Sequence, residues 1–169
     1  MPGGVDAHVH LCQDLMSGMY GFSSFTRIWA TLMLRTGPHG LGGECADNFE
    51  TGSRSAAAGG TTTMITFAPQ SRAESDRSLV GVLEAYRKRA EATGSYIDYG
   101  FHMIIVRNDA DVLRDELPIL ANDWGVTSCK LFMTYEAQRL SDGALLDVMW
   151  AAKKNAIMTV SSSPVQTYV

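Results

Sequence analysis

The feature that most constrains the fold is an alternation of apolar segments with segments of helical periodicity. The apolar segments are rich in β-branched residues and mostly lack the polar–apolar alternation of a half-exposed strand. Continuous apolar strands are typical of parallel sheets that are covered on both faces, and parallel strands need helical crossovers between them. The sequence therefore predicts an α/β fold of consecutive βαβ units.

Turn and capping residues place the boundaries of these segments. Asp47 with Glu50 forms a capping-box pattern at the start of a helix, and Gly59-Gly60 predicts its left-handed end. Asp76 is the predicted cap of the next helix. After a first strand that ends at His8 and His10, the predicted strands are 61–67, 96–106, 129–133 and 156–160. The predicted helices cover about 48–58, 77–93, 111–124 and a segment that Ser141 caps.

Composition narrows the class of protein. The 169 residues carry a net charge of −4 without a basic run, which argues against nucleic acid and anionic membranes as partners. Three cysteines, Cys12, Cys45 and Cys129, are odd in number and lack a CxxC spacing, so we expect a reducing compartment. With no 18-residue apolar run and no leader-like start, the expected location is the cytoplasm.

Five strands with intervening helices fit either an open doubly wound sheet or part of a (β/α)₈ barrel. No GxGxxG follows the first strand, which weakens a dinucleotide-binding interpretation, and no Walker phosphate loop is present. A whole barrel of this type needs about 250 residues, so this chain could hold only part of one.

Two histidines stand where the first strand ends. Side chains alternate along a strand, so His8 and His10 point to the same face, as two ligands of a metal ion would. A His-X-His pair also arises by chance, and on its own it is only half of a metal site.

Lys130 lies inside the fourth apolar strand. Burial of a lysine lowers its pKa and exposes a neutral amine, which can react with carbon dioxide to form a carbamate, an anionic metal ligand. Alternatively, the aliphatic stem of Lys130 is buried and its ammonium group reaches water. The strand pattern alone leaves both possibilities open.

Three segments together resemble the dihydropyrimidinase and hydantoinase family of cyclic amidohydrolases. Residues 2–11 (PGGVDAHVHL) resemble its metal-binding opening, 49–62 (FETGSRSAAAGGTT) its next segment, and 125–135 (GVTSCKLFMTY) its carbamylated-lysine strand. The resemblance covers about residues 2–14 and 37–160.

The resemblance implies a fold, a site and a reaction. It implies a partial TIM-type (β/α)₈ barrel, about the first five strands of the amidohydrolase barrel. It implies that His8 and His10 bind one Zn²⁺, that carbamylated Lys130 bridges two Zn²⁺ ions, and that Tyr135 contacts the substrate and donates its hydroxyl to the oxyanion. The implied reaction opens a ring such as 5,6-dihydrouracil or hydantoin to an N-carbamoyl amino acid. Full-length members are expected to form homotetramers.

The chain also departs from the family pattern. The family site needs two further histidines and an aspartate, and Ser161 stands where the first of these histidines is expected. Residues 15–36 match nothing in the pattern. They are either an insertion or, in our preferred interpretation, translated intron sequence. The same origin is possible for the tail 161–169, which leaves 1–160 as the partial barrel domain. We therefore expect this chain alone to be incomplete and inactive.

Two other functions remain open. One is a non-catalytic relative that acts in assembly or interaction, although such relatives typically lose the metal ligands that this chain keeps. The other is a different cyclic amidohydrolase, such as an allantoinase or dihydroorotase. Of the remaining histidines, His39 is interpreted as a loop residue that could contact substrate, and His102 as a hydrogen-bonded barrel residue.

Overall fold

The strands form one parallel sheet whose order follows the sequence. The computed structural model describes residues 2–13, 45–135 and 138–162. The strands are β1 (Gly4–Val9), β2 (Thr61–Pro69), β3 (Asp98–Ile104), β4 (Ser128–Phe132) and β5 (Met158–Ser162). Their order in the sheet is β1-β2-β3-β4-β5, and every neighbouring pair is parallel. A doubly wound sheet reverses its strand order at a switch point, so this unbroken order identifies the barrel alternative.

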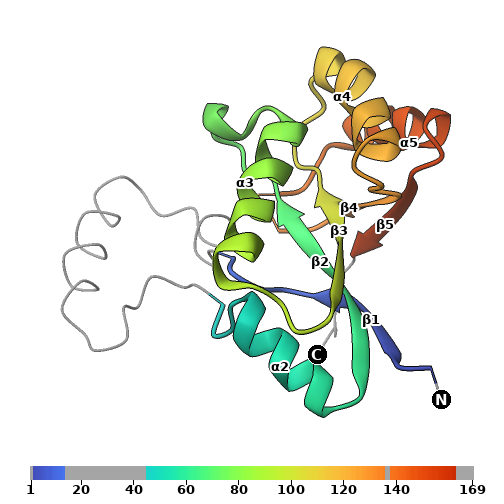
Figure 1. Ribbon diagram of the computed structural model, residues 1–169. Coiled ribbons are helices and arrows are strands. Elements are labelled where there is room, and N and C mark those ends of the chain that lie inside the picture. Colours follow the sequence, from blue (N-terminus) through green and yellow to red (C-terminus); the bar gives the residue numbers. More distant parts are fainter. Residues whose placement is uncertain (1, 14–44, 136–137, 163–169) are drawn as a thin grey trace, which may run out of the picture.

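The helices between the strands lie on one side of the curled sheet (Figure 1). They are α2 (Phe49–Ala58), α3 (Leu79–Thr93), α4 (Ala110–Asn122) and α5 (Asp142–Lys154), with a short 3₁₀ helix η1 (Glu74–Asp76) before α3. Helices on the outer side of a curled parallel sheet are the arrangement of a (β/α)₈ barrel, here with five of its strands. The predicted α/β partial barrel is therefore confirmed. In the part of the chain that the structure describes, no helix is long and apolar enough to cross a membrane.

Apolar side chains sort onto the two faces of the sheet. Met103, Ile105 and Leu131 belong to the main core, which packs beneath the helices. A smaller cluster holds Phe67, Ile104, Val106 and Phe132. Successive residues of one strand alternate between the two clusters, as the two-residue period requires. The smaller cluster therefore lies on the concave face, which is the interior of the partial barrel.

Two predicted helix caps are wrong by one or two residues. Asn48, and not Asp47, caps α2: its side chain accepts the N–H of Thr51 at 2.9 Å, and the Thr51 hydroxyl accepts the N–H of Asn48 at 3.2 Å. Ser78, and not Asp76, caps α3, because its hydroxyl accepts the N–H of Gly81 at 3.0 Å. Each error has the same reason, since a second capping residue lies within two positions of the first and only the chain path selects between them.

Other boundaries agree with the sequence or differ by a short shift. Ser141 caps α5 as predicted, and the positive φ of Gly60, 88°, matches the left-handed end predicted for α2. The strand predicted from Tyr96 begins at Asp98. The strand predicted from Ala156 begins at Met158. Ala156 has a φ of 55°, and the N–H of Ile157 still donates to the carbonyl of Ala152 in α5.

Candidate functional site

The two histidines of the first strand converge on one point. Their Nε2 atoms lie 3.4 Å apart, so both imidazoles are on the same side of β1, as their spacing predicts. The register between β1 and β2 shifts between Asp6 and Val9, and the Asp6 carboxylate accepts the backbone N–H of His8 at 3.0 Å. The segment of β1 that carries the histidine pair therefore includes a local irregularity in its pairing with β2.

Phe67 of β2 lies at the centre of the site. Its ring is 97% buried, and its centroid lies 4.8 Å from each of the rings of His8 and His10. The Nζ atom of Lys130 lies 4.5 Å from the same centroid. The structure therefore brings His8, His10 and Lys130 together around one aromatic ring on the concave face.

Lys130 is held in an apolar environment. Its side chain is only 6% exposed, and its Nζ atom also lies 5.1 Å from the ring centroid of Phe132. Among the described residues every ion pair joins an arginine to a carboxylate, and none includes Lys130. Burial lowers the pKa of the lysine below its usual 10.5. Burial therefore weakens the preference of Lys130 for its charged ammonium form.

The imidazoles are also shifted toward their neutral forms. Burial is the main cause that lowers the pKa of His8 and of His10 below 6.5, and the charge of Lys130 lowers both further. The hydrogen bond to Gln13 opposes the shift at His10 without reversing it. Neutral imidazoles are the form that binds metal ions.

Gln13 connects His10 to the second strand. Its Oε1 atom lies 2.7 Å from Nδ1 of His10, and its amide group donates to the backbone carbonyl of Phe67. The side chain is only 7% exposed, although glutamine is usually a surface residue.

His102 has the structural role expected for it. Its Nε2 atom lies 2.9 Å from the carbonyl oxygen of Ala7, and its Nδ1 atom is hydrogen-bonded to the hydroxyl of Ser128. Since both ring nitrogens already have partners in β1 and β4, His102 ties these strands together and has no free ligand atom.

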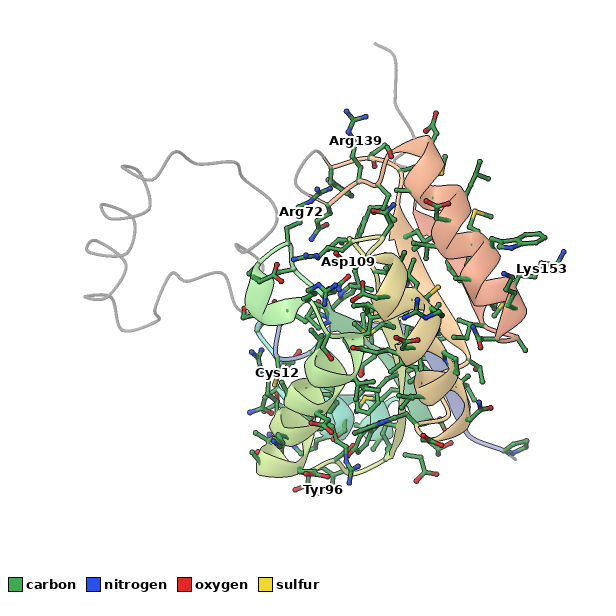
Figure 2. All side chains as sticks on the ribbon, turned by 90° about the horizontal axis from the view of Figure 1, so that it is seen from above. Cys12, Arg72, Tyr96, Asp109, Arg139 and Lys153 are labelled. Atoms are coloured by element: carbon green, nitrogen blue, oxygen red, sulfur yellow. The ribbon has the colours of Figure 1, made fainter. Side chains whose placement is uncertain are left out.

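Tyr135 lies in the loop that follows β4, beyond the cluster around Phe67. Its ring makes an edge contact with Phe132 at 5.9 Å, and its backbone has a φ of 68°, which is rare for a residue other than glycine. The carbonyl of Tyr135 accepts the N–H of Arg139, and Arg72 of the loop between β2 and α3 donates to the carbonyl of Arg139 at 2.6 Å (Figure 2). The tyrosine side chain is half exposed at the same end of the sheet as the histidines.

The remaining candidate residues from the sequence have no described side chains. His39 and the unmatched segment 15–36 lie outside the described residues, and the side chain of Ser161 is not described. Within the described ranges, no group of three or more His, Cys, Asp or Glu residues could hold a metal ion.

Sequence reasoning missed Phe67, Gln13 and Ser128. Gln13 follows His10 by three residues and Phe67 ends a predicted strand, so each lies close to a feature that the sequence analysis recognised. Their contacts depend on strand register, which places Phe67 opposite His102 and which sequence spacing does not give.

Curated relatives include a D-hydantoinase and a dihydropyrimidinase. The D-hydantoinase of Streptomyces coelicolor is 38% identical over 156 residues, which are 92% of this chain and 27% of that protein. The dihydropyrimidinase of Arabidopsis thaliana is 32% identical over 148 residues, 87% of this chain and 22% of that protein. The chain therefore spans about a quarter of the length of these relatives.

Solved structures and a family model agree with these matches. The crystal structure of dihydropyrimidinase from Brevibacillus agri superposes with a TM-score of 0.72 at 29% identity, covering 95% of this chain and 28% of that one. A D-hydantoinase crystal structure gives a TM-score of 0.73 at 32% identity, again over 95% and 28%. The model of the amidohydrolase family matches residues 1–162. The chain therefore belongs to the amidohydrolase family.

Proposed function

We propose that this chain is part of a zinc-dependent hydrolase that opens cyclic amides or ureides, such as hydantoin or 5,6-dihydrouracil, to N-carbamoyl amino acids. The observation that carries the proposal is the convergence of His8, His10 and the buried Lys130 around Phe67. The names of the relatives, D-hydantoinase and dihydropyrimidinase, support the substrate class.

The histidine pair fits a zinc ion by its geometry and chemistry. Zinc binds imidazole nitrogen at about 2.0–2.1 Å, so two such ligands at a tetrahedral angle stand about 3.3 Å apart. The two Nε2 atoms lie 3.4 Å apart. The pair can therefore bind one ion with little movement of either ring. Zinc ions, when bound, would polarise the ring carbonyl and lower the pKa of a water molecule.

Lys130 fits the role of a carbamate-forming residue. Attack of a neutral amine on carbon dioxide forms an N–C bond and releases one proton, which leaves an anionic carbamate. Burial lowers the pKa of Lys130 and so raises the fraction of the neutral amine that this step needs. We propose that the resulting carbamate supplies the anionic oxygen ligands that bridge two zinc ions.

Tyr135 is proposed as the hydroxyl donor to the substrate. Its loop follows directly on the strand that carries Lys130, and its backbone is held in a left-handed conformation. Strained backbone at such a position often serves to aim a side chain. A hydroxyl hydrogen bond to the oxyanion formed when the ring amide is attacked would stabilise the transition state.

We propose further that the 169-residue polypeptide has little activity by itself. In the described residues the site brings together two histidines and one lysine, whereas the family resemblance calls for two more histidines and an aspartate. We also propose that the whole protein assembles as a homotetramer. Its proposed substrates include hydantoin, dihydrouracil and related rings.

The test is to measure bound zinc and ring hydrolysis on the same preparation. The polypeptide is equilibrated with zinc and bicarbonate, dialysed, and assayed with hydantoin and dihydrouracil. We expect bound zinc that is lost in a His8→Asn, His10→Asn double variant and kept in His39→Asn, with at most trace hydrolysis. Zinc retained by the double variant would contradict the site. Two tightly bound zinc ions with rapid turnover would contradict the proposed incompleteness.

A further inference from the structure

The side chain of Gln13 links a proposed metal ligand to the backbone of the neighbouring strand. Its Oε1 atom lies 2.7 Å from Nδ1 of His10, while its Nε2 atom donates to the carbonyl of Phe67. Gln13 is buried to 93%, so neither contact is exchanged freely with water. Two directional contacts fix the carboxamide in one orientation.

That orientation determines which nitrogen of His10 carries the proton. A backbone carbonyl only accepts hydrogen bonds, so the carboxamide must turn its NH₂ group toward Phe67. Its carbonyl oxygen then faces His10, and this oxygen also only accepts. The Nδ1 atom of His10 must therefore be the protonated nitrogen of the neutral ring.

The consequence is that the other nitrogen carries the lone pair. With Nδ1 protonated, Nε2 of His10 is unprotonated, and this is the atom that lies 3.4 Å from Nε2 of His8. Ligating histidines commonly donate their second N–H to a neighbouring oxygen, which fixes tautomer and orientation. Here the neighbouring oxygen belongs to a side chain whose own position is set by β2.

We propose that Gln13 is a positioning residue that holds His10 in its Nδ1–H tautomer and so prepares Nε2 to bind the metal ion. The choice of zinc as the ion rests on the proposed function. The tautomer itself is a property of the metal-free chain, so the two can be tested separately.

His102 provides an internal reference for this test. Its Nε2 atom faces the carbonyl of Ala7, which requires the Nε2–H tautomer, and the hydroxyl of Ser128 then donates to Nδ1. The two histidines are thus predicted to hold opposite tautomers in the same molecule, and only His10 depends on Gln13.

The first measurement is nuclear magnetic resonance of the metal-free chain labelled with ¹⁵N at histidine, at pH 8. Two-bond ¹H–¹⁵N correlations are expected to show a protonated Nδ1 in His10 and a protonated Nε2 in His102. In Gln13→Met, which keeps the length of the side chain without its acceptor, His10 is expected to mix both tautomers while His102 is unchanged. Unchanged His102 signals also show that the variant is folded.

The second measurement is zinc affinity by competition with a chelator. Loss of such a supporting partner typically weakens metal binding about 10–100-fold, and this loss is expected for Gln13→Met. Gln13→Glu loses the bond to Phe67 but keeps an acceptor for Nδ1, so we expect zinc affinity within about threefold of the original chain. A merely structural role would weaken both variants alike.

The outcomes separate the two proposals. Failure of the original chain to bind zinc, with the predicted tautomers observed, would overturn the proposed function and leave the role of Gln13 in the tautomer intact. Zinc binding with a His10 tautomer and affinity that are unchanged in Gln13→Met would overturn the inference. An Nε2–H tautomer of His10 in the original chain would overturn it as well.

Discussion

The Nε2 atom of His102 lies 2.9 Å from the carbonyl oxygen of Ala7, although their strands are not neighbours in the sheet. β2 lies between β1 and β3, so this hydrogen bond crosses the concave face above β2 and supports the curvature of the sheet. Ala7 directly precedes His8. The same bond therefore also fixes the strand segment that presents the proposed ligands.

Replacement of His102 by phenylalanine should destabilise the fold. The change keeps a ring of similar size but leaves the Ala7 carbonyl and the Ser128 hydroxyl without their partner. Leaving the buried Ser128 hydroxyl unsatisfied costs about 1–3 kcal/mol in the free energy of unfolding, whereas water can replace the partner of the exposed Ala7 carbonyl. Urea unfolding followed by circular dichroism measures the loss, with the exposed Glu84→Gln as a control expected within about 0.5 kcal/mol of the original chain. Equal stability of His102→Phe and the control would refute the bridging role.

Stability should fall as the pH drops below 6.5. Burial is the main cause that lowers the pKa of His8, His10 and His102 in the folded chain. The unfolded chain then binds more protons below about pH 6.5, so stability is complete above that pH and declines below it toward the folded pKa values. We expect a smaller free energy of unfolding at pH 5.5 than at pH 7.5, with a lesser drop in His102→Phe. A free energy of unfolding that does not change between these pH values would contradict the lowered histidine pKa values.

Replacement of Lys130 by methionine should stabilise the metal-free chain. In buffer free of carbon dioxide, methionine fills the same apolar space without an amine whose charged form burial disfavours. Folding lowers the pKa of Lys130, so the buried lysine reduces the free energy of unfolding most at neutral pH. This reduction shrinks as the pH approaches 10.5. Unfolding at pH 7 and at pH 9.5 should show the gain in Lys130→Met decreasing with pH. Lys153→Met, at an exposed position of α5, should show no such trend.

Lys130 should also carry a carbamate when carbon dioxide is supplied. With ¹³C-bicarbonate and zinc, carbon magnetic resonance is expected to show a carbamate signal in the original chain and in Lys153→Met. The signal should be absent from Lys130→Met. A carbamate signal that persists in Lys130→Met would assign the adduct to another amine.

The sequence predicts the order of elements and the shared face of His8 and His10 because both depend on short-range patterns, whereas the roles of Lys130 and Tyr135 came from the family resemblance. Apolar runs, helical spacing and the His-X-His pair lie within a few residues, and the structure places Lys130 beside that pair. The caps at Asn48 and Ser78 were missed because neighbouring residues have nearly equal capping tendencies. Phe67 and Gln13 were missed because their roles depend on register between strands that are far apart in the sequence.

Replacement of Tyr135 by phenylalanine should separate catalysis from metal binding. The tyrosine is half exposed, so loss of its hydroxyl should leave zinc affinity unchanged and the free energy of unfolding within about 0.5 kcal/mol. In a hybrid in which this chain replaces the matching quarter of the Streptomyces coelicolor D-hydantoinase, kcat for hydantoin should fall about 10²–10³-fold. Tyr96→Phe, at another exposed tyrosine, is the matched control. Equal kcat values for the two variants would remove Tyr135 from the mechanism.

X-ray absorption at the zinc edge of the zinc-loaded chain reports which atoms bind the metal ion. Two imidazole ligands with Zn–N distances of about 2.0–2.1 Å are expected, reduced to one imidazole in His10→Asn. No sulfur ligand from Cys129 is expected, because burial raises the pKa of this thiol to about 12. Sulfur scattering at about 2.3 Å, or a spectrum that His10→Asn leaves unchanged, would contradict the claim that His8 and His10 form the metal site.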